Sequence, residues 1–242
     1  MAISASISRL AAYYKRHGFP ATLRRFTLAA KRALFSNRMV LLYCDLSTQY
    51  STSADLPCSL KVERHRSQTD VNPRDLEEIT KFWNPLLSTR NIKARFDKGG
   101  SLWLIKSEGQ LAGYGWTLQG NTVEPHYFRL GPDDIHLFDF QVFPQYRGQG
   151  MNPVLVRYIL RSLAEDCRGR AFIEAAEWNQ QQLASLKRTP FRRLGLATKF
   201  TFLKHTIVCW DDKQAAEKHR QEDLNNASTA NRKDAKIPGL RV

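Results

Sequence analysis

Residues 142–150 read Val-Phe-Pro-Gln-Tyr-Arg-Gly-Gln-Gly, and this stretch decides the fold. It ends the β-type run His136–Phe143 and leads into the helical run Pro153–Asp166. Strand, glycine-rich turn and helix therefore follow one another directly. Gly148 and Gly150 lack Cβ atoms, so a phosphate can approach the backbone N–H groups of the turn closely. The pattern predicts a phosphate-binding loop at the start of a helix.

Side chains beside this loop suit an anionic ligand. Arg147 adds a positive charge next to the two glycines. Asn152 is a residue type that often caps a helix N-terminus, and Pro153 suits the first helical position because its missing N–H loses no partner there. We therefore expect the helix to start at Asn152, with its unpaired N–H groups and the positive end of its dipole facing the loop.

The surrounding sequence alternates strand and helix patterns. Runs of β-branched and alternating apolar residues predict strands, and apolar residues at three- or four-residue spacing predict helices. The expected strands are Val40–Tyr43, Leu60–Val62, Ser101–Ile105, Leu111–Leu118, His136–Phe143, Ala171–Ala176 and Ala197–Val208. One expected helix begins at Asn72, and the others cover Pro85–Phe96, Pro153–Asp166 and Gln180–Leu194. This order predicts one domain of the α/β class in its mixed α+β form.

The chain divides into three zones by composition. Residues 1–38 form a basic amphipathic arm with eight Lys or Arg and no acidic side chain. Residues 39–210 carry the patterns of the folded domain. Residues 211–242 are polar and poor in large apolar side chains, so we expect a disordered tail there.

The net charge of +14 indicates an anionic partner, and more than half of this charge lies in the arm 1–38. A basic amphipathic helix of this kind predicts peripheral contact with an anionic membrane surface. Two alternatives remain open, a helix packed on the domain with its basic side in water and an organellar targeting segment. Nucleic acid is a disfavoured partner, because the charge lies in a terminal arm without a recognition motif.

The four cysteines, Cys44, Cys58, Cys167 and Cys209, form no CxxC pair and have no histidine at metal-ligand spacing. This indicates reduced thiols and no metal. No apolar run reaches the roughly 18 residues that cross a bilayer. We therefore expect a cytoplasmic protein that can lie at the inner face of a membrane through its arm.

The glycine loop resembles the pyrophosphate signature of the GNAT superfamily of N-acetyltransferases, Arg/Gln-x-x-Gly-x-Gly/Ala. Gln145, Gly148 and Gly150 match it, and the context Val-x-Pro-x-Tyr-Arg-Gly stands at 142–148. Further along, Asn179, Ser185 and the segment 191–196 are similar to the family's Asn…Ser/Ala…Lys-Leu-Gly-Phe segment. Together these matches cover roughly residues 60–205.

The resemblance implies the GNAT acyltransferase fold, a central mixed sheet with splayed parallel strands flanked by helices. It also implies acetyl-CoA as co-substrate, with its pantetheine arm between the splayed strands. The residues that the resemblance assigns to the cofactor are Phe140, Val142, Gln145, Arg147, Gly148, Gln149, Gly150, Asn152 and Asn179.

An acceptor amine must lose a proton, and a carboxylate or imidazole commonly takes it. The candidates on the two strands are His136, Asp139, Glu174 and Glu177. Asp139 ranks first because it interrupts an apolar strand, although it could instead make an ordinary hydrogen bond on the opposite side. Glu177 ranks second, beside the splayed end. Phe191 stands where many family members have a proton-donating tyrosine, so the general acid is unassigned.

The expected reaction is transfer of an acetyl group to a small amine, with an amino sugar or a nucleotide-linked amino sugar as the preferred acceptor. Stacking aromatics and arginines suggest this acceptor. They are Trp83, Arg90, Arg95, Trp103, Trp116, His126, Tyr127 and Arg129. The alternative is a non-catalytic CoA-binding module of the same fold, docked on an anionic membrane through the arm.

Overall fold

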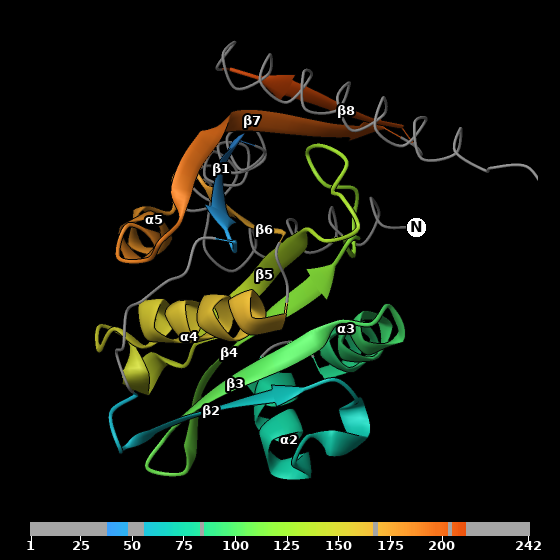
Figure 1. The fold of residues 1–242 in the computed structure, drawn as a ribbon. Coiled ribbons are helices and arrows are strands. Elements are labelled where there is room, and N and C mark those ends of the chain that lie inside the picture. The colour runs from blue at the N-terminus through green and yellow to red at the C-terminus, as the bar shows by residue number, and fades with distance from the viewer. Residues whose placement is uncertain (1–37, 48–55, 83–84, 167–168, 203–204, 212–242) are drawn as a thin grey trace, which may run out of the picture.

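The computed structural model describes residues 38–47, 56–82, 85–166, 169–202 and 205–211. These residues form eight strands and six helical segments (Figure 1). The strands are β1 (Arg38–Asp45), β2 (Leu60–His65), β3 (Ser101–Ser107), β4 (Gln110–Gln119), β5 (Ile135–Val142), β6 (Arg170–Ala176), β7 (Arg192–Phe202) and β8 (His205–Trp210). The helices are η1 (Gln68–Asp70), α2 (Pro73–Phe82), α3 (Pro85–Asp97), η2 (Pro144–Tyr146), α4 (Met151–Asp166) and α5 (Gln180–Leu186). The predicted mixed α+β class is confirmed.

All eight strands belong to one sheet in the order β2-β3-β4-β5-β6-β1-β7-β8. β1 is therefore an interior strand, antiparallel to both β6 and β7. β5 and β6 are parallel to each other, and α4 crosses between them. The sequence predicted a mixed sheet, and the single parallel pair lies at its centre.

Helices cover both faces of the sheet (Figure 1). On one face α4 contributes Leu155 and Ile159 to a core cluster that includes Leu137. On the other face Ile79 of α2 and Ile92 of α3 belong to a second cluster with strand residues of β3 and β4. Because successive strand residues point to opposite faces, residues on one side of β5 and β6 face α4 and their neighbours face away from it.

Two predictions for the C-terminal half are wrong. The helix predicted over Gln180–Leu194 ends at Leu186, because the residue before Pro190 is disfavoured in a helical conformation. The strand predicted over Ala197–Val208 is two antiparallel strands, β7 and β8. The β-forming residues of the two strands gave no sign that the chain reverses its direction between them.

The ends of the described domain lie next to each other. Arg38 is the first residue of β1, and its guanidinium lies 2.6 Å from the carboxylate of Asp211. Arg38 was predicted to belong to the arm 1–38, but it is the first residue of β1. Apart from Arg38 and Asp211, the predicted arm and the predicted tail 211–242 lie outside the described residues. Within the described ranges, no helix is long and apolar enough to cross a membrane.

Candidate active site

The parallel strands β5 and β6 separate along their length. They pair only between Ile135–Leu137 and Ala171–Ile173. Beyond this point β5 continues along β4 as far as Val142, and β6 continues along β1 as far as Ala176. The predicted splay is confirmed, and it leaves an opening between the two strands at their carboxyl ends.

The glycine loop lies at the end of β5. After the short helix η2, Gly148 and Gly150 have φ angles of +80° and +76°, a conformation that residues with a Cβ rarely adopt. The Arg147 Nε donates to the carbonyl of Val142 at 3.2 Å. A Cβ on Gly148 would meet no heavy atom within 4 Å, so space beside the loop is open.

Asn152 does not cap α4. The helix begins at Met151, where the Val154 N–H donates to the carbonyl of Gly150, so Asn152 already lies in the first turn. Its side-chain amide instead donates to the Ser185 hydroxyl at 2.9 Å and joins α4 to α5. The N-cap position is Gly150, so the prediction of an N-cap at Asn152 was wrong by two residues. The positive end of the helix still meets the loop.

The other cofactor residues predicted from sequence flank the same region. Gln145 and Gln149 are both exposed, and the side-chain amide of Gln149 donates to the main-chain carbonyl of Gln145 at 3.1 Å. Asn179 is the N-cap of α5, since its side-chain oxygen accepts from the N–H of Gln182 at 3.2 Å. Phe191, in place of the usual tyrosine, is 7% exposed and belongs to the core cluster under α4.

Asp139 lies in a β-bulge. The register of β4 against β5 shifts there, so that Asp139 and Phe140 together oppose Gly115. The φ angle of Asp139 is +52°, and its carboxylate forms an ion pair with Arg95 of α3. This ion pair explains an acidic residue in an otherwise apolar strand.

Glu177, the second predicted catalytic residue, lies just after β6. Its carboxylate is 3.3 Å from the guanidinium of Arg38, and its side chain is 42% exposed. Both acidic residues that the sequence ranked highest thus form an ion pair with an arginine.

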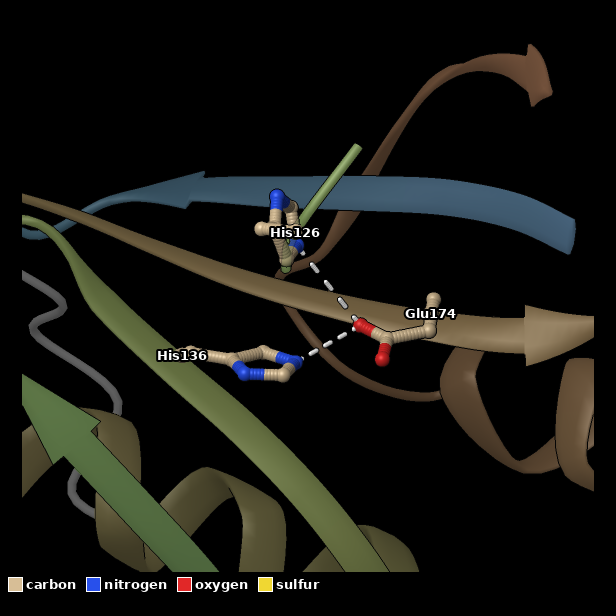
Figure 2. A group of neighbouring side chains, drawn as sticks. All are labelled: His126, His136 and Glu174. Carbon is tan, nitrogen blue, oxygen red and sulfur yellow. Dashed lines mark hydrogen bonds and ion pairs between the residues drawn. The ribbon is translucent and has the colours of Figure 1, made fainter. Parts of the chain in front are cut away.

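A cavity of about 150 Å³ lies on the face of β5 and β6 that is turned away from α4. Its walls come from α3, the segment before β5, β5, β6 and β7. Three of the lining side chains form a cluster, in which the imidazoles of His126 and His136 point at one oxygen of Glu174 (Figure 2). The Nε2 of His136 lies 2.8 Å from this oxygen, and the Nε2 of His126 lies 3.8 Å from it.

The cluster is buried, and its electrostatics follow from that. Burial opposes the ionisation of Glu174, but the electrostatic attraction of His136 and the contacts of both imidazoles with this carboxylate outweigh it and lower the pKa of this carboxyl to about 2. Burial lowers the pKa of His126, and Glu174 only partly offsets this effect. Glu174 is therefore ionised and His126 is neutral near pH 7.

These three residues also offer ligand atoms within 4.8 Å of one another, and zinc accepts two imidazoles and a carboxylate. A histidine bound to zinc normally donates its other N–H to an acceptor. Among the described residues, neither the Nδ1 of His126 nor that of His136 has a hydrogen-bond partner. Arg95 and Lys199 add positive charge to the same cavity. We therefore assign no metal to the cluster, whose groups suit proton transfer better.

The aromatic and basic set predicted for the acceptor side is only partly at the cavity. Arg95, His126 and Tyr127 line it. Trp103 and Trp116 are 1% and 0% exposed, so both belong to the core and cannot stack on a ligand. Local sequence patterns did not separate these core tryptophans from a binding surface, because both environments favour aromatic residues.

A family model described as the acetyltransferase (GNAT) family matches residues 69–191, which is half of the chain. The match includes the splayed strands, the glycine loop and the whole of α4. The chain therefore belongs to the GNAT family of acetyltransferases, as the sequence motifs indicated. No protein of curated function matches it.

Solved structures with a similar fold are distant. An acetyltransferase of the GNAT family from Colwellia psychrerythraea is 12% identical, with a TM-score of 0.48 over 64% of this chain and 52% of that one. A GCN5-related N-acetyltransferase from Kribbella flavida is 11% identical, with a TM-score of 0.41 over 64% of this chain and 54% of that one. A Bacillus subtilis acetyltransferase in complex with CoA is 16% identical, with a TM-score of 0.42 over 55% and 76%. The chain spans little more than half of the first two structures.

Proposed function

We propose that this protein transfers the acetyl group of acetyl-CoA to the amino group of a small acceptor. One observation carries the proposal: the glycine loop and the N-terminus of α4 lie at the end of the strand that separates from β6. A phosphate group at the loop would meet backbone N–H groups and the positive end of the helix dipole. A thioester in the opening would lie beside main-chain donors of β5, which can stabilise the negative charge that develops on its carbonyl oxygen.

In this proposal the pyrophosphate lies against Gly148 and Gly150, with Arg147 beside it. The open space next to Gly148 leaves room for it. The pantetheine follows the edge of β5 at Phe140 and Val142. The residues around this path are Gln145, Gln149, Asn152 and Asn179.

The acceptor enters the cavity on the face of β5 and β6 that is turned away from α4. The cavity volume of about 150 Å³ is about five times the roughly 30 Å³ that one water occupies in the liquid, enough for the amine-bearing end of an acceptor. Tyr127 offers an aromatic surface, and Lys199 holds its ammonium over that ring at 5.0 Å from the centroid. These groups are compatible with an amino sugar or a nucleotide-linked amino sugar, which is the acceptor class that we propose.

The experiment is acetyl transfer from radiolabelled acetyl-CoA to D-glucosamine, a nucleotide-linked amino sugar, spermidine and L-lysine. We expect label in an amino-sugar product, and none with Gly148→Glu protein, whose loop carries a negative side chain. Transfer to spermidine or lysine alone would keep the reaction and reject the acceptor class. Label in no product would reject the proposed function.

A further inference from the structure

We propose that His126 takes the proton from the acceptor amine, and that Glu174 and His136 are positioning residues that hold it for this task. The inference rests on the proposed function, because it names the proton acceptor for the same acetyl transfer. His126 lies outside both splayed strands, in the segment between β4 and β5.

His126 lines the cavity and makes no hydrogen bond among the described residues, as expected of a base in a site without its substrate. Its side chain is only 4% exposed, and it lines the cavity. Among the described residues, neither of its ring nitrogens has a hydrogen-bond partner. Because buried polar atoms normally form hydrogen bonds, an imidazole without one in a cavity wall points to a group that binds there.

Glu174 is placed to orient the imidazole of His126 and to stabilise its protonated form. Its carboxylate lies 3.8 Å from the Nε2 of His126 and accepts from the Nε2 of His136 at 2.8 Å (Figure 2). His136 is 7% exposed and stacks on Phe138 at 5.1 Å between ring centroids, so it fixes the carboxylate in place. A carboxylate that orients an imidazole and stabilises its protonated form is the arrangement that activates bases in acyl transfer.

The protonation state of His126 fits this role. Burial lowers its pKa from the usual value, so the ring is neutral and has a lone pair near pH 7. The charged and titratable groups that face it are Arg95, Glu124, Tyr127, His136, Glu174 and Lys199. Arg95 is balanced by Asp139, and Lys199 donates to the carbonyl of Pro125. Glu174 is thus the charge best placed to stabilise an imidazolium.

The strand carboxylates ranked first by the sequence are less suited. The ion pair with Arg95 occupies Asp139, and the one with Arg38 occupies Glu177. Glu177 is also partly in water, with a side chain that is 42% exposed. Neither residue lines the cavity.

The proposed step balances with acetyl-CoA and the amine alone. The neutral amine, formed when its ammonium loses a proton to water, bonds through its lone pair to the thioester carbonyl carbon. A nitrogen of His126 removes one proton from the attacking nitrogen. The carbon–sulfur bond breaks with its electron pair on sulfur. The imidazolium then returns the proton to the CoA thiolate, so His126 also supplies the proton that Phe191 cannot give.

Steady-state kinetics with acetyl-CoA and D-glucosamine, or the amine of the panel that is acetylated fastest, test the proposal. We expect His126→Gln to lower kcat by about 10²–10⁴-fold with the KM for acetyl-CoA unchanged, as loss of a general base predicts. Glu174→Gln should lower kcat less and move the acid limb of the pH profile to lower pH, because the carboxylate raises the pKa of His126. An acetyl-CoA-induced thermal shift confirms that each variant is folded.

The matched control is His65→Gln. His65 also pairs with a glutamate, since its Nε2 lies 3.5 Å from Glu63, but it belongs to the edge strand β2. It should keep the wild-type kcat. A fully active His126→Gln enzyme, or a larger loss of kcat in Asp139→Asn than in His126→Gln, would overturn the proposal.

A second readout does not depend on the acceptor. The ¹H–¹³C signals of the histidine rings report the pKa of His126 directly, which we expect below its usual value and lower still in Glu174→Gln. A His126 pKa that is insensitive to Glu174→Gln would reject the role of Glu174 in stabilising protonated His126, even if acetyl transfer is confirmed. A wild-type protein that acetylates no amine would instead reject the proposed function, and the ring titrations would remain a test of the cluster.

Discussion

Gly115 shows how a single residue shapes the opening between β5 and β6. A Cβ at Gly115 would lie 2.4 Å from the Cε1 of Phe140, a distance that real Cβ contacts do not reach. The ring of Phe140 therefore lies over the glycine, at the bulge where β5 carries one residue more than β4. Phe140 can take this position at the edge of β5 only because Gly115 in β4 has no side chain.

Gly115→Ala should destabilise the protein by about 1–3 kcal/mol, because overpacking forces the ring or the strand to move. Urea unfolding measures this cost. Phe140→Ala in the same chain removes the clash, so the double variant should be more stable than the sum of the two single changes predicts. Equal unfolding midpoints for Gly115→Ala and wild type would contradict the packing seen at the bulge.

At the scale of elements, one lysine fastens α2 to the sheet. The ammonium of Lys106 in β3 lies 2.8 Å from Asp75 in α2 and 2.9 Å from Glu63 in β2. Burial alone would lower the pKa of Lys106, but the hydrogen bonds that its ammonium donates to the two carboxylates outweigh it and raise this pKa. Burial likewise opposes the ionisation of Glu63, whose bonds to Lys106 and Lys61 lower its pKa to about 2.

Lys106→Met should cost about 2–4 kcal/mol of unfolding free energy, because it leaves two largely buried carboxylates without their cation. The control is Lys93→Met, whose ammonium pairs with Asp97 on the surface of α3 at 2.9 Å with both side chains exposed. Exposed pairs are worth little, so this change should stay within about 0.5 kcal/mol. Similar costs for both variants in urea unfolding would show that Lys106 does not anchor α2.

At the scale of the whole molecule, local patterns predicted the centre of the fold and part of the site. The strand, glycine loop and helix over 136–166 are contiguous, so their residue types alone indicated the phosphate-binding geometry. The family resemblance added the splayed pair of strands. The end of α5 at Leu186 was missed because helical spacing was extended across Pro190, a residue type that a helix interior excludes.

The proposed proton acceptor could not be predicted in this way. His136 and Glu174 are 38 residues apart in sequence and meet only because β5 and β6 lie side by side. His126 comes from a segment without regular secondary structure, which has no periodicity to show which way a side chain points. The importance of Asp139 was judged from its apolar neighbours, and the bulge and Arg95 give that residue another role.

The measurement that tests the central claim most directly is the thermal midpoint with and without acetyl-CoA. At about 100 times Kd the ligand should add about 2.7 kcal/mol, which raises the midpoint of a domain of this size by about 5–10 °C. Gly148→Glu and Gly150→Glu should abolish the rise. Gly109→Glu is the matched control, because Gly109 has a φ of +77° and open space around it but lies in the β3–β4 turn. This control should keep the rise, whereas an undiminished rise in both loop variants, or none in the wild type, would contradict a cofactor site at the glycine loop.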